Sequence, residues 1–463
     1  MTVGSPTGAA VARDRTGPDT LSAVRVVLPA GAPLDPYALA GDSGILVVDG
    51  GRVLVGLGAA ATFELPDGVA DPDAVDAVVD ALAAVPCDDR VGAGSTGPGH
   101  PVVAFGALPF DRHAPGALVV PELLYCRERD GTEWVTLVVA DGDTGPGPAD
   151  PAAALRDRLA ERAAAPEGGA AGPVGLRIEP RTSDDHFLRS VATAVDAISH
   201  HDLVKVVLAR SVDVHLDHEV DLVALLRRWA AIEPSCVVFS VPTPDGQFVG
   251  ASPELLVERH GTRFRSRPLA GTTDRVHGTG SGLPPELLDS AKDGEEHRLV
   301  VDAIREVLAP ISADLDVPDR PELVHLHSIT HLGTTVDGTL RPSSDGRVPS
   351  ALHLVALLHP TPAVAGVPRR TATELIEELE PTPRGTYAGP VGYVDGAGDG
   401  RWMVGIRAMT VAGRSVRMTA GVGIVAGSRP ETELVETRLK FRAVFDALAP
   451  GVPFDTGDGP DRG

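Results

Sequence analysis

The segment from Gly421 to Lys440 constrains the fold most, because it joins a glycine-punctuated apolar strand to a helix whose start is marked in the sequence. Ser428 and Glu431 form an S-x-x-E capping box, and Pro430 falls in the first turn of the expected helix. Apolar residues then recur at helical spacing, which predicts a helix packed against a sheet. The residues predicted to form its apolar face are Leu434, Val435, Leu439, Phe441, Val444, Phe445 and Leu448.

Two helices each carry a pair of carboxylates three residues apart. Glu433 and Glu436 share one flank of the helix above with Lys440, and by themselves they could be a solvated acidic stripe with a Glu436–Lys440 pair. Asp293 and Glu296 extend the core-facing stripe of an earlier helix, where carboxylates are costly to bury without a partner. The matching pairs favour a shared Mg²⁺ site, since oxygen ligands suit that ion.

Composition limits the classes of partner. The chain has 463 residues and a net charge of −23, which argues against nucleic acid or an anionic membrane surface as partner. Its three cysteines, Cys87, Cys126 and Cys236, have neither metal-ligand spacing nor a disulfide pattern. No apolar run approaches the roughly 18 residues that a membrane span requires, and the first 20 residues contain no apolar signal segment. We therefore expect a cytoplasmic protein without a membrane partner.

The distribution of glycine, proline and apolar runs predicts the domain organisation. Short β-like runs surround a helix at 73–84, and a Gly/Pro-rich stretch with a short helix at 152–164 follows them. These early segments carry no recognisable chemistry. The predicted organisation is a disordered start at 1–22, a scaffold part at 23–174, a catalytic region at 175–450 and a disordered tail at 451–463.

Three charged residues lie in otherwise apolar surroundings. Lys205 lies within an apolar strand at 203–214, so it either reaches out to water or is desolvated enough to act as a base. Glu254 lies between a proline turn and an apolar strand, where burial would raise its pKa and keep it protonated as an acid; alternatively it faces water in the turn. Arg407 is expected inside a strand at 402–411, where a buried arginine requires a carboxylate.

Small residues and histidines complete the set of candidate groups. The small residues of 268–273 would let backbone N–H groups approach an anion. His325, His327 and His331 suggest zinc at first sight, but strand spacing separates His331 from the other two and no further ligand is evident. His331 could instead donate a hydrogen bond to a substrate oxygen.

Six motifs together resemble the chorismate-utilising enzymes, the family of isochorismate, salicylate, anthranilate and aminodeoxychorismate synthases. The resemblance covers about residues 182–448. It implies an α/β fold of the α+β type, with two large mainly antiparallel sheets flanked by helices, Mg²⁺ as cofactor and chorismate as substrate. The motifs are Ser252-Pro253-Glu254-Leu255, Pro268-Leu269-Ala270-Gly271-Thr272, Glu295-Glu296-His297, His331-Leu332, Gly421-Val422-Gly423-Ile424-Val425, and Glu433 with Glu436-Thr437 and Lys440.

The same resemblance implies a role for each site residue. Lys205 would be the general base that activates water at ring carbon C2, and Glu254 would protonate the departing C4 hydroxyl. His331 would orient the reacting region. Residues implied to hold Mg²⁺ are Glu296, Glu433 and Glu436, with Asp293, where family members often carry glutamate, beside them. Residues implied to bind substrate are Tyr387, Arg407, Lys440 and the backbone at Gly271, Thr272, Gly421 and Gly423.

Fewer residues distinguish the members of the family. Water-adding members resemble this chain in carrying lysine at Lys205, whereas amine-adding members often have glutamine there. Salicylate synthase shares nearly all of the site, but pyruvate-eliminating members tend to carry a polar residue where this chain has Ala363. We expect an isochorismate synthase that serves menaquinone or siderophore biosynthesis, monomeric and without a glutaminase partner. The alternatives are a salicylate synthase and a non-catalytic chorismate-binding protein.

Overall fold

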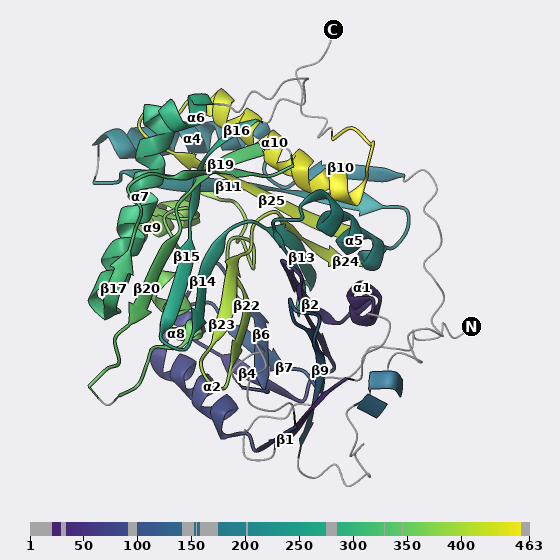
Figure 1. The fold of residues 1–463 in the computed structure, drawn as a ribbon. Coiled ribbons are helices and arrows are strands. Elements are labelled where there is room, and N and C mark those ends of the chain that lie inside the picture. Colours follow the sequence, from purple (N-terminus) through teal and green to yellow (C-terminus); the bar gives the residue numbers. More distant parts are fainter. Residues whose placement is uncertain are drawn as a thin grey trace.

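Two large sheets and the helices around them form the protein (Figure 1). The structure is a computed structural model that describes residues 21–28, 34–90, 100–140, 152–153, 155–157, 175–200, 202–274, 285–327, 329–344 and 346–454. Residues 152, 153 and 155–157 are helical, and the rest of the helix expected at 152–164 lies outside the described residues.

The larger sheet has 13 strands within the described residues and carries the glycine-rich strand that precedes the last helix. Its pairings are antiparallel except that of β1 with β5. Its strands in spatial order are β10 (Leu176–Pro180), β11 (Lys205–Leu216), β25 (Ser415–Ile424), β24 (Ala408–Ala412), β13 (Gly246–Ser252), β12 (Val237–Thr243), β2 (Ile45–Asp49), β3 (Arg52–Leu57), β8 (Leu123–Arg127), β9 (Glu133–Ala140), β1 (Leu21–Val27) and β5 (Cys87–Asp89), with β21 (Gly366–Val367) beside β11.

A nine-stranded antiparallel sheet and a three-stranded one complete the β structure of the described residues. The nine strands in spatial order are β17 (Ser312–Asp316), β20 (Val336–Leu340), β15 (Arg263–Arg267), β14 (Leu255–His260), β23 (Gly400–Val404), β22 (Pro390–Asp395), β6 (Val103–Ala107), β7 (Gly116–Val120) and β4 (Ala61–Leu65). The small sheet consists of β16 (Leu269–Asp274), β19 (Ile329–Gly333) and β18 (Glu322–His325). The expected fold of two large, mainly antiparallel sheets is confirmed.

Helices cover the outer faces of both sheets (Figure 1). The last helix packs on β25 and on the helix that precedes β11, while the helix at 351–358 packs on β14 and β23. No helix among the described residues is both long and apolar enough to cross a membrane. The helices are α1 (Pro36–Ala40), α2 (Pro72–Ala84), α4 (Asp184–His200), α5 (Leu222–Ile232), α6 (Pro285–Asp289), α7 (Ala291–Leu308), α8 (Ala351–Leu358), α9 (Arg369–Leu379) and α10 (Pro430–Leu448), with short 3₁₀ turns at Gly68–Ala70 and Ala309–Ile311.

The early and late parts of the chain share both sheets. β2 pairs with β12 in the larger sheet, and β6 pairs with β22 in the nine-stranded one. One buried apolar cluster contains Phe239 and Phe248 of the first sheet together with Val391 and Met403 of the second. The expected scaffold part at 23–174 therefore supplies strands to the same two sheets as the expected catalytic region.

Both chain ends differ from expectation where the structure describes them. β1 begins at Leu21, so the last two residues of the segment expected to be disordered belong to a strand. Phe454 was expected in a disordered tail, but its ring centroid lies 5.6 Å from that of Phe441 and 5.2 Å from that of Phe445. Residues 1–20 and 455–463 lie outside the described residues.

The capping box expected at the start of α10 does not form. The residue before the helix is Arg429, and no side chain caps the helix there. Ser428 Oγ instead accepts the backbone N–H of Val425 at 3.2 Å, which closes the turn between β25 and α10. Val435, expected on the apolar face, is 52% exposed. A serine before a helix can serve either the helix or the turn, and here the turn takes it.

Candidate active site

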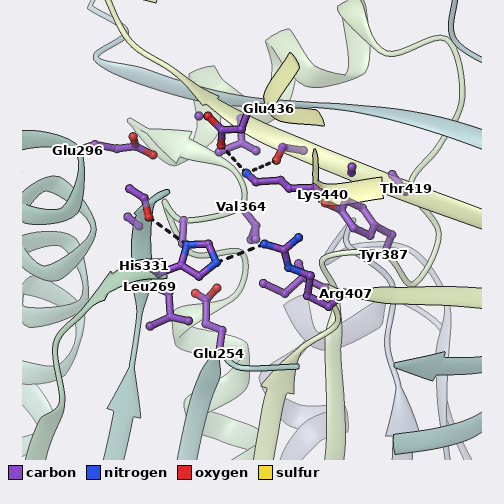
Figure 2. Close-up of a pocket in the computed structure, with 18 of the residues that line it drawn as sticks. Glu254, Leu269, Glu296, His331, Val364, Tyr387, Arg407, Thr419, Glu436 and Lys440 are labelled. Carbon is purple, nitrogen blue, oxygen red and sulfur yellow. Dashed lines mark hydrogen bonds and ion pairs between the residues drawn. The ribbon is translucent and has the colours of Figure 1, made fainter. Parts of the chain in front are cut away.

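A cleft between β11, β25, β16 and β19 and helices α7 and α10 gathers most of the candidate residues (Figure 2). It holds about 860 Å³ of empty space, counting its open mouth. Residues singled out in the sequence that line it are Glu254, Gly271, Asp293, Glu296, His331, Ala363, Tyr387, Arg407, Gly421, Gly423, Glu436 and Lys440.

Lys205 does not itself line the cleft but contacts Glu296, which does. It is the first residue of β11, its side chain is 1% exposed, and its Nζ lies 3.0 Å from Oε1 of Glu296. Burial rules out the alternative in which the lysine reaches out to water. A Cβ at Gly423, on the paired strand β25, would lie 2.4 Å from that Oε1 and 3.1 Å from Cε of Lys205. Glycine is therefore needed at this position for the ion pair to fit.

Glu254 points into the cleft from the side opposite Glu436 and Lys440 (Figure 2). It lies between β13 and β14, where its N–H donates to Ser252 Oγ at 3.3 Å and its C=O accepts the N–H of Val404 at 3.0 Å. The residue is 3% exposed, so it does not face water. Burial raises the pKa of its carboxyl to about 8, although the positive charge of Lys205 opposes the shift. Glu254 is therefore protonated at neutral pH and can act as an acid.

His331 and Arg407 form a hydrogen-bonded pair. The Nδ1 of His331 lies 3.0 Å from the C=O of Gly271, and its Nε2 lies 3.3 Å from Nη2 of Arg407. Burial, with the nearby guanidinium, lowers the pKa of His331 to about 3. The ring is therefore neutral, donating from Nδ1 and accepting at Nε2. His331 therefore orients the guanidinium of Arg407. Its one N–H is used by the C=O of Gly271, so the hydrogen bond that His331 was expected to donate to a substrate oxygen does not fit this arrangement.

The strand expected at 402–411 is in fact two strands of different sheets. β23 ends at Val404, β24 begins at Ala408, and Arg407 between them has a φ of 53°. Such a conformation is uncommon for a residue with a side chain. The crossing points the guanidinium into the cleft (Figure 2). Its Nη1 is buried and has no hydrogen-bond partner among the described residues, so it can serve an anion.

The remaining charged candidates lie on α7 and α10. Lys440 Nζ lies 2.7 Å from Oε1 of Glu436 and donates to the C=O of Gly421 at 2.8 Å. Asp293 lines the cleft, and its carboxylate accepts a hydrogen bond from Ser290, the N-cap of α7. Glu433 is 1% exposed and does not line the cleft as the other three carboxylates do.

Comparison with known proteins identifies the family. A family model described as chorismate binding enzyme matches residues 48–449. The chain belongs to the chorismate-binding enzymes. The resemblance expected for 182–448 is confirmed and extends back to residue 48.

Named members of this family are similar over most of their length. Isochorismate synthase DhbC from Bacillus subtilis is 40% identical over 280 residues, which cover 58% of this chain and 69% of that protein. Isochorismate synthase EntC from Escherichia coli is 35% identical over 356 residues, or 75% of this chain and 81% of that protein. The solved structure of MenF, the menaquinone-specific isochorismate synthase of E. coli, matches with a TM-score of 0.73 at 23% identity, covering 92% of this chain and 94% of that one. This last likeness shows the fold.

The carboxylates of the cleft decide whether this chorismate-binding enzyme could hold the expected Mg²⁺. Among the described residues, no three His, Cys, Asp or Glu side chains converge closely enough to hold an ion together. Mg²⁺, however, is usually held by one or two carboxylates with waters and substrate completing its shell. Glu296 and Glu436 line one cleft from two helices, and they fit this open kind of site. They do not form an all-protein cage.

The other histidines and Thr272 add no side chain to the described cleft lining. His325 bonds Thr330 Oγ1 through Nδ1 at 3.1 Å and does not line the cleft with His331, so the described histidines form no zinc site. Thr272 lies in β16 opposite His331, and its side chain is outside the described part of the structure.

Several residues of the cleft were not singled out in the sequence. They include apolar and hydroxyl side chains on the same strands as the candidates. The strand period of two could have found some of them, since Thr419 shares a face of β25 with Gly421 and Gly423, and Val207 shares a face of β11 with Lys205. The residues missed are Val207, Val364, Ile406, Thr419, Ala420 and Val444, whereas Leu269 and Ala270 belong to the segment 268–273 that was expected to approach an anion.

Proposed function

We propose that this chain is an isochorismate synthase, which converts chorismate reversibly to isochorismate by adding water at ring carbon C2 and losing the C4 hydroxyl. The observation that carries the proposal is a buried acid that lines the cleft together with a buried lysine bonded to another lining residue. Glu254 lines the cleft in its protonated form, and Lys205 lies 3.0 Å from Glu296, which lines it as well. The names of the relatives at 35–40% identity agree with this assignment.

The two groups divide the proton transfers. As the base, Lys205 takes a proton from water while the oxygen bonds to C2. Glu254 gives its proton to the C4 oxygen, which leaves as water. One water enters and one leaves, so the reaction is an isomerisation. The ammonium formed on Lys205 is balanced by Glu296, whose Oε1 lies 3.0 Å away. A positioned base or acid typically contributes about 10²–10⁴-fold to such a rate.

Basic and hydroxyl groups on the other walls would hold the carboxylates of chorismate. Arg407 offers its buried Nη1, and neutral His331 fixes the direction of the guanidinium. Tyr387 and Lys440 line the same cleft. The backbone at Gly271, Thr272, Gly421 and Gly423 would complete the binding surface. An arginine aimed by a neutral histidine suits a planar carboxylate.

Glu296 and Glu436 would hold Mg²⁺, with Asp293 and Glu433 as the further carboxylates of α7 and α10. The ion, when bound, supplies positive charge for a substrate carboxylate. We place the enzyme in the cytoplasm as a monomer. It needs no glutaminase subunit, because water as nucleophile requires no ammonia source.

Two alternatives remain distinct from this proposal. A salicylate synthase would go on to eliminate pyruvate, but the methyl group of Ala363 in the cleft offers no polar atom to assist that step. A protein that only binds chorismate would have no use for a buried acid opposite a buried lysine.

The test is incubation of the purified protein with chorismate, with Mg²⁺ or with EDTA, and chromatographic separation of the products. Lys205→Ala and Glu254→Gln are run alongside. We expect isochorismate to approach a fixed ratio with chorismate, and this conversion to be lost with EDTA and in both variants. Salicylate and pyruvate would identify the first alternative. Tight binding without conversion would identify the second.

A further inference from the structure

Strand β11, which carries Lys205, has a gap along its outer edge. On its inner edge it pairs with β25 from Val206 to His215. On its outer edge β21 covers Lys205 and Val206, and β10 covers residues 212–216. No strand among the described residues pairs with the outer edge at 207–211. Backbone groups in such a buried gap need other partners.

The side chains of Glu380 and Arg384 fill the first part of this gap. Arg384 donates from Nη2 to the C=O of Val207 at 2.7 Å, and Glu380 accepts the N–H of Ala209 on Oε1 at 2.8 Å. The two side chains also bond each other, with Arg384 Nε 2.9 Å from Oε2 of Glu380. The side chain of Arg384 is 2% exposed and that of Glu380 is 7% exposed. The ion pair thus bonds β11 as a neighbouring strand would, one C=O and one N–H in turn.

Arg384 also bonds the turn that lies next to β11 in the cleft wall, where the C=O of Ala365 accepts the N–H of Val207 at 2.7 Å. Its Nη1 donates to the C=O of Val364 at 2.7 Å. Val364 and the preceding Ala363 line the cleft, as Val207 does. The C=O of Arg384 itself accepts the N–H of Tyr387, another lining residue, at 3.1 Å. The guanidinium of Arg384 therefore connects two segments of the cleft wall, and its backbone C=O holds the third.

The planar guanidinium of Arg384 allows these hydrogen bonds to form at the same time. A planar guanidinium can donate in three directions at once, whereas the ammonium of lysine is a single point on a flexible stem. Phe110 fixes the plane from one side, since its ring centroid lies 4.2 Å from Cζ of Arg384. Glu380 balances the buried charge, which would otherwise be costly.

We propose that Glu380 and Arg384 are a positioning pair, which sets the cleft wall of Val207, Val364 and Tyr387 relative to Lys205 and so fixes where the substrate ring lies. Neither side chain lines the cleft, so the pair acts through the backbone of the wall. The inference rests on the proposed function for the reaction it serves. It does not depend on the metal, whose proposed ligands lie on α7 and α10.

The experiment compares Arg384→Lys, Glu380→Gln and Arg384→Ala with the wild type. Arg259→Lys is the matched control, because Arg259 also pairs with a buried carboxylate, Asp399 at 3.0 Å, and donates to a backbone C=O at 2.8 Å, but does not line the cleft or bond its wall. Isochorismate formation gives KM, kcat and the half-saturating Mg²⁺ concentration. Calorimetry measures chorismate binding without turnover, and thermal unfolding measures stability.

We expect Arg384→Lys and Glu380→Gln to raise KM and the dissociation constant of chorismate about tenfold, because a displacement of about 1 Å in a positioning group is enough for such losses. The half-saturating Mg²⁺ concentration should change less than twofold. Guanidinium ions added to Arg384→Ala should restore part of the affinity. Arg259→Lys should lower the unfolding temperature and leave KM unchanged.

The inference is overturned if the Arg384 and Glu380 variants lose stability as Arg259→Lys does but keep the wild-type KM and affinity. It is also overturned if affinity and Mg²⁺ dependence fall together, since the damage would then extend beyond the wall. Should Arg384→Ala fail to fold, Glu380→Gln, which keeps an acceptor for the N–H of Ala209, decides the question. A wild type that binds chorismate without converting it would refute the proposed function, while the calorimetric comparison would still test the pair.

Discussion

Gly423→Ala tests the geometry around Lys205 with a single methyl group. The added Cβ would lie 2.4 Å from Oε1 of Glu296, 3.2 Å from its Cδ and 3.1 Å from Cε of Lys205. Ordinary contacts begin near 3.4 Å, so the carboxylate oxygen must retreat by about 1 Å. The oxygen ends a flexible side chain that is 13% exposed, so the retreat costs the fold little.

The consequence for catalysis is larger than that for stability. Lengthening the Lys205–Glu296 distance from 3.0 Å to about 4 Å weakens the pair by roughly 1 kcal/mol at an effective dielectric constant of about 20. Misplacing the base by a similar distance can cost about 10²-fold. We therefore expect kcat/KM to fall about 10²-fold in Gly423→Ala. The half-saturating Mg²⁺ concentration should rise as well, since Glu296 is displaced.

The assay is initial-rate formation of isochorismate by chromatography, at several Mg²⁺ concentrations, with thermal unfolding measured in parallel. Gly427→Ala is the control, because Gly427 lies four residues further on, in the turn between β25 and α10, and a Cβ there would meet nothing within 4 Å. A kcat/KM of Gly423→Ala within threefold of the wild type would refute the role given to the ion pair. A large loss with unchanged Mg²⁺ dependence would show that the methyl group acts on substrate instead of on Glu296.

Three further predictions concern pH and packing. Burial raises the pKa of Glu254 to about 8, so the folded state binds a proton that the unfolded state loses, and the free energy of unfolding falls as pH rises from about 5 to 8. Glu254→Gln should flatten this fall in denaturant titrations. Because Glu254 acts as an acid, the kcat of the wild type should decline above about pH 8. The pKa of His331 is lowered to about 3, so the folded state binds fewer protons and stability rises from about pH 3 to 6.5; His331→Asn should lose less stability on acidification than the wild type. Phe454→Ala removes ring contacts with Phe441 and Phe445, and should cost about 1 kcal/mol in chemical unfolding with KM unchanged.

Local pattern predicted much of the fold and many of the cleft residues. The helix expected at 73–84 is observed at Pro72–Ala84, and the apolar strand expected at 203–214 is observed at Lys205–Leu216, because periodic or continuous apolar runs between turn residues mark buried elements. Lys205 and Glu254 were recognisable because a charge inside an apolar run is costly and therefore needs a reason. In the structure Glu254 lines the cleft, and Lys205 bonds Glu296 of the cleft lining.

The features that the sequence did not predict depend on tertiary context. The apolar run around Arg407 reads as one strand, and only its pairing shows that it passes from one sheet to the other. Glu433 has the same helical spacing from Glu436 as Asp293 has from Glu296, yet packing buries it away from the cleft lining. Glu380 and Arg384 resemble a solvated i, i+4 pair, and their function as a substitute strand requires the gap in β11.

The most direct test of the proposed reaction is a short incubation of the enzyme with chorismate and Mg²⁺ in oxygen-18 water, followed by mass spectrometry of the separated products. If solvent water is activated by Lys205 and added at C2, early isochorismate carries one oxygen-18 atom in its ring hydroxyl, unreacted chorismate carries none, and Lys205→Ala yields no labelled product. Unlabelled isochorismate would mean that the hydroxyl moves within the substrate, and it would contradict the assignment of Lys205 and Glu254 as base and acid.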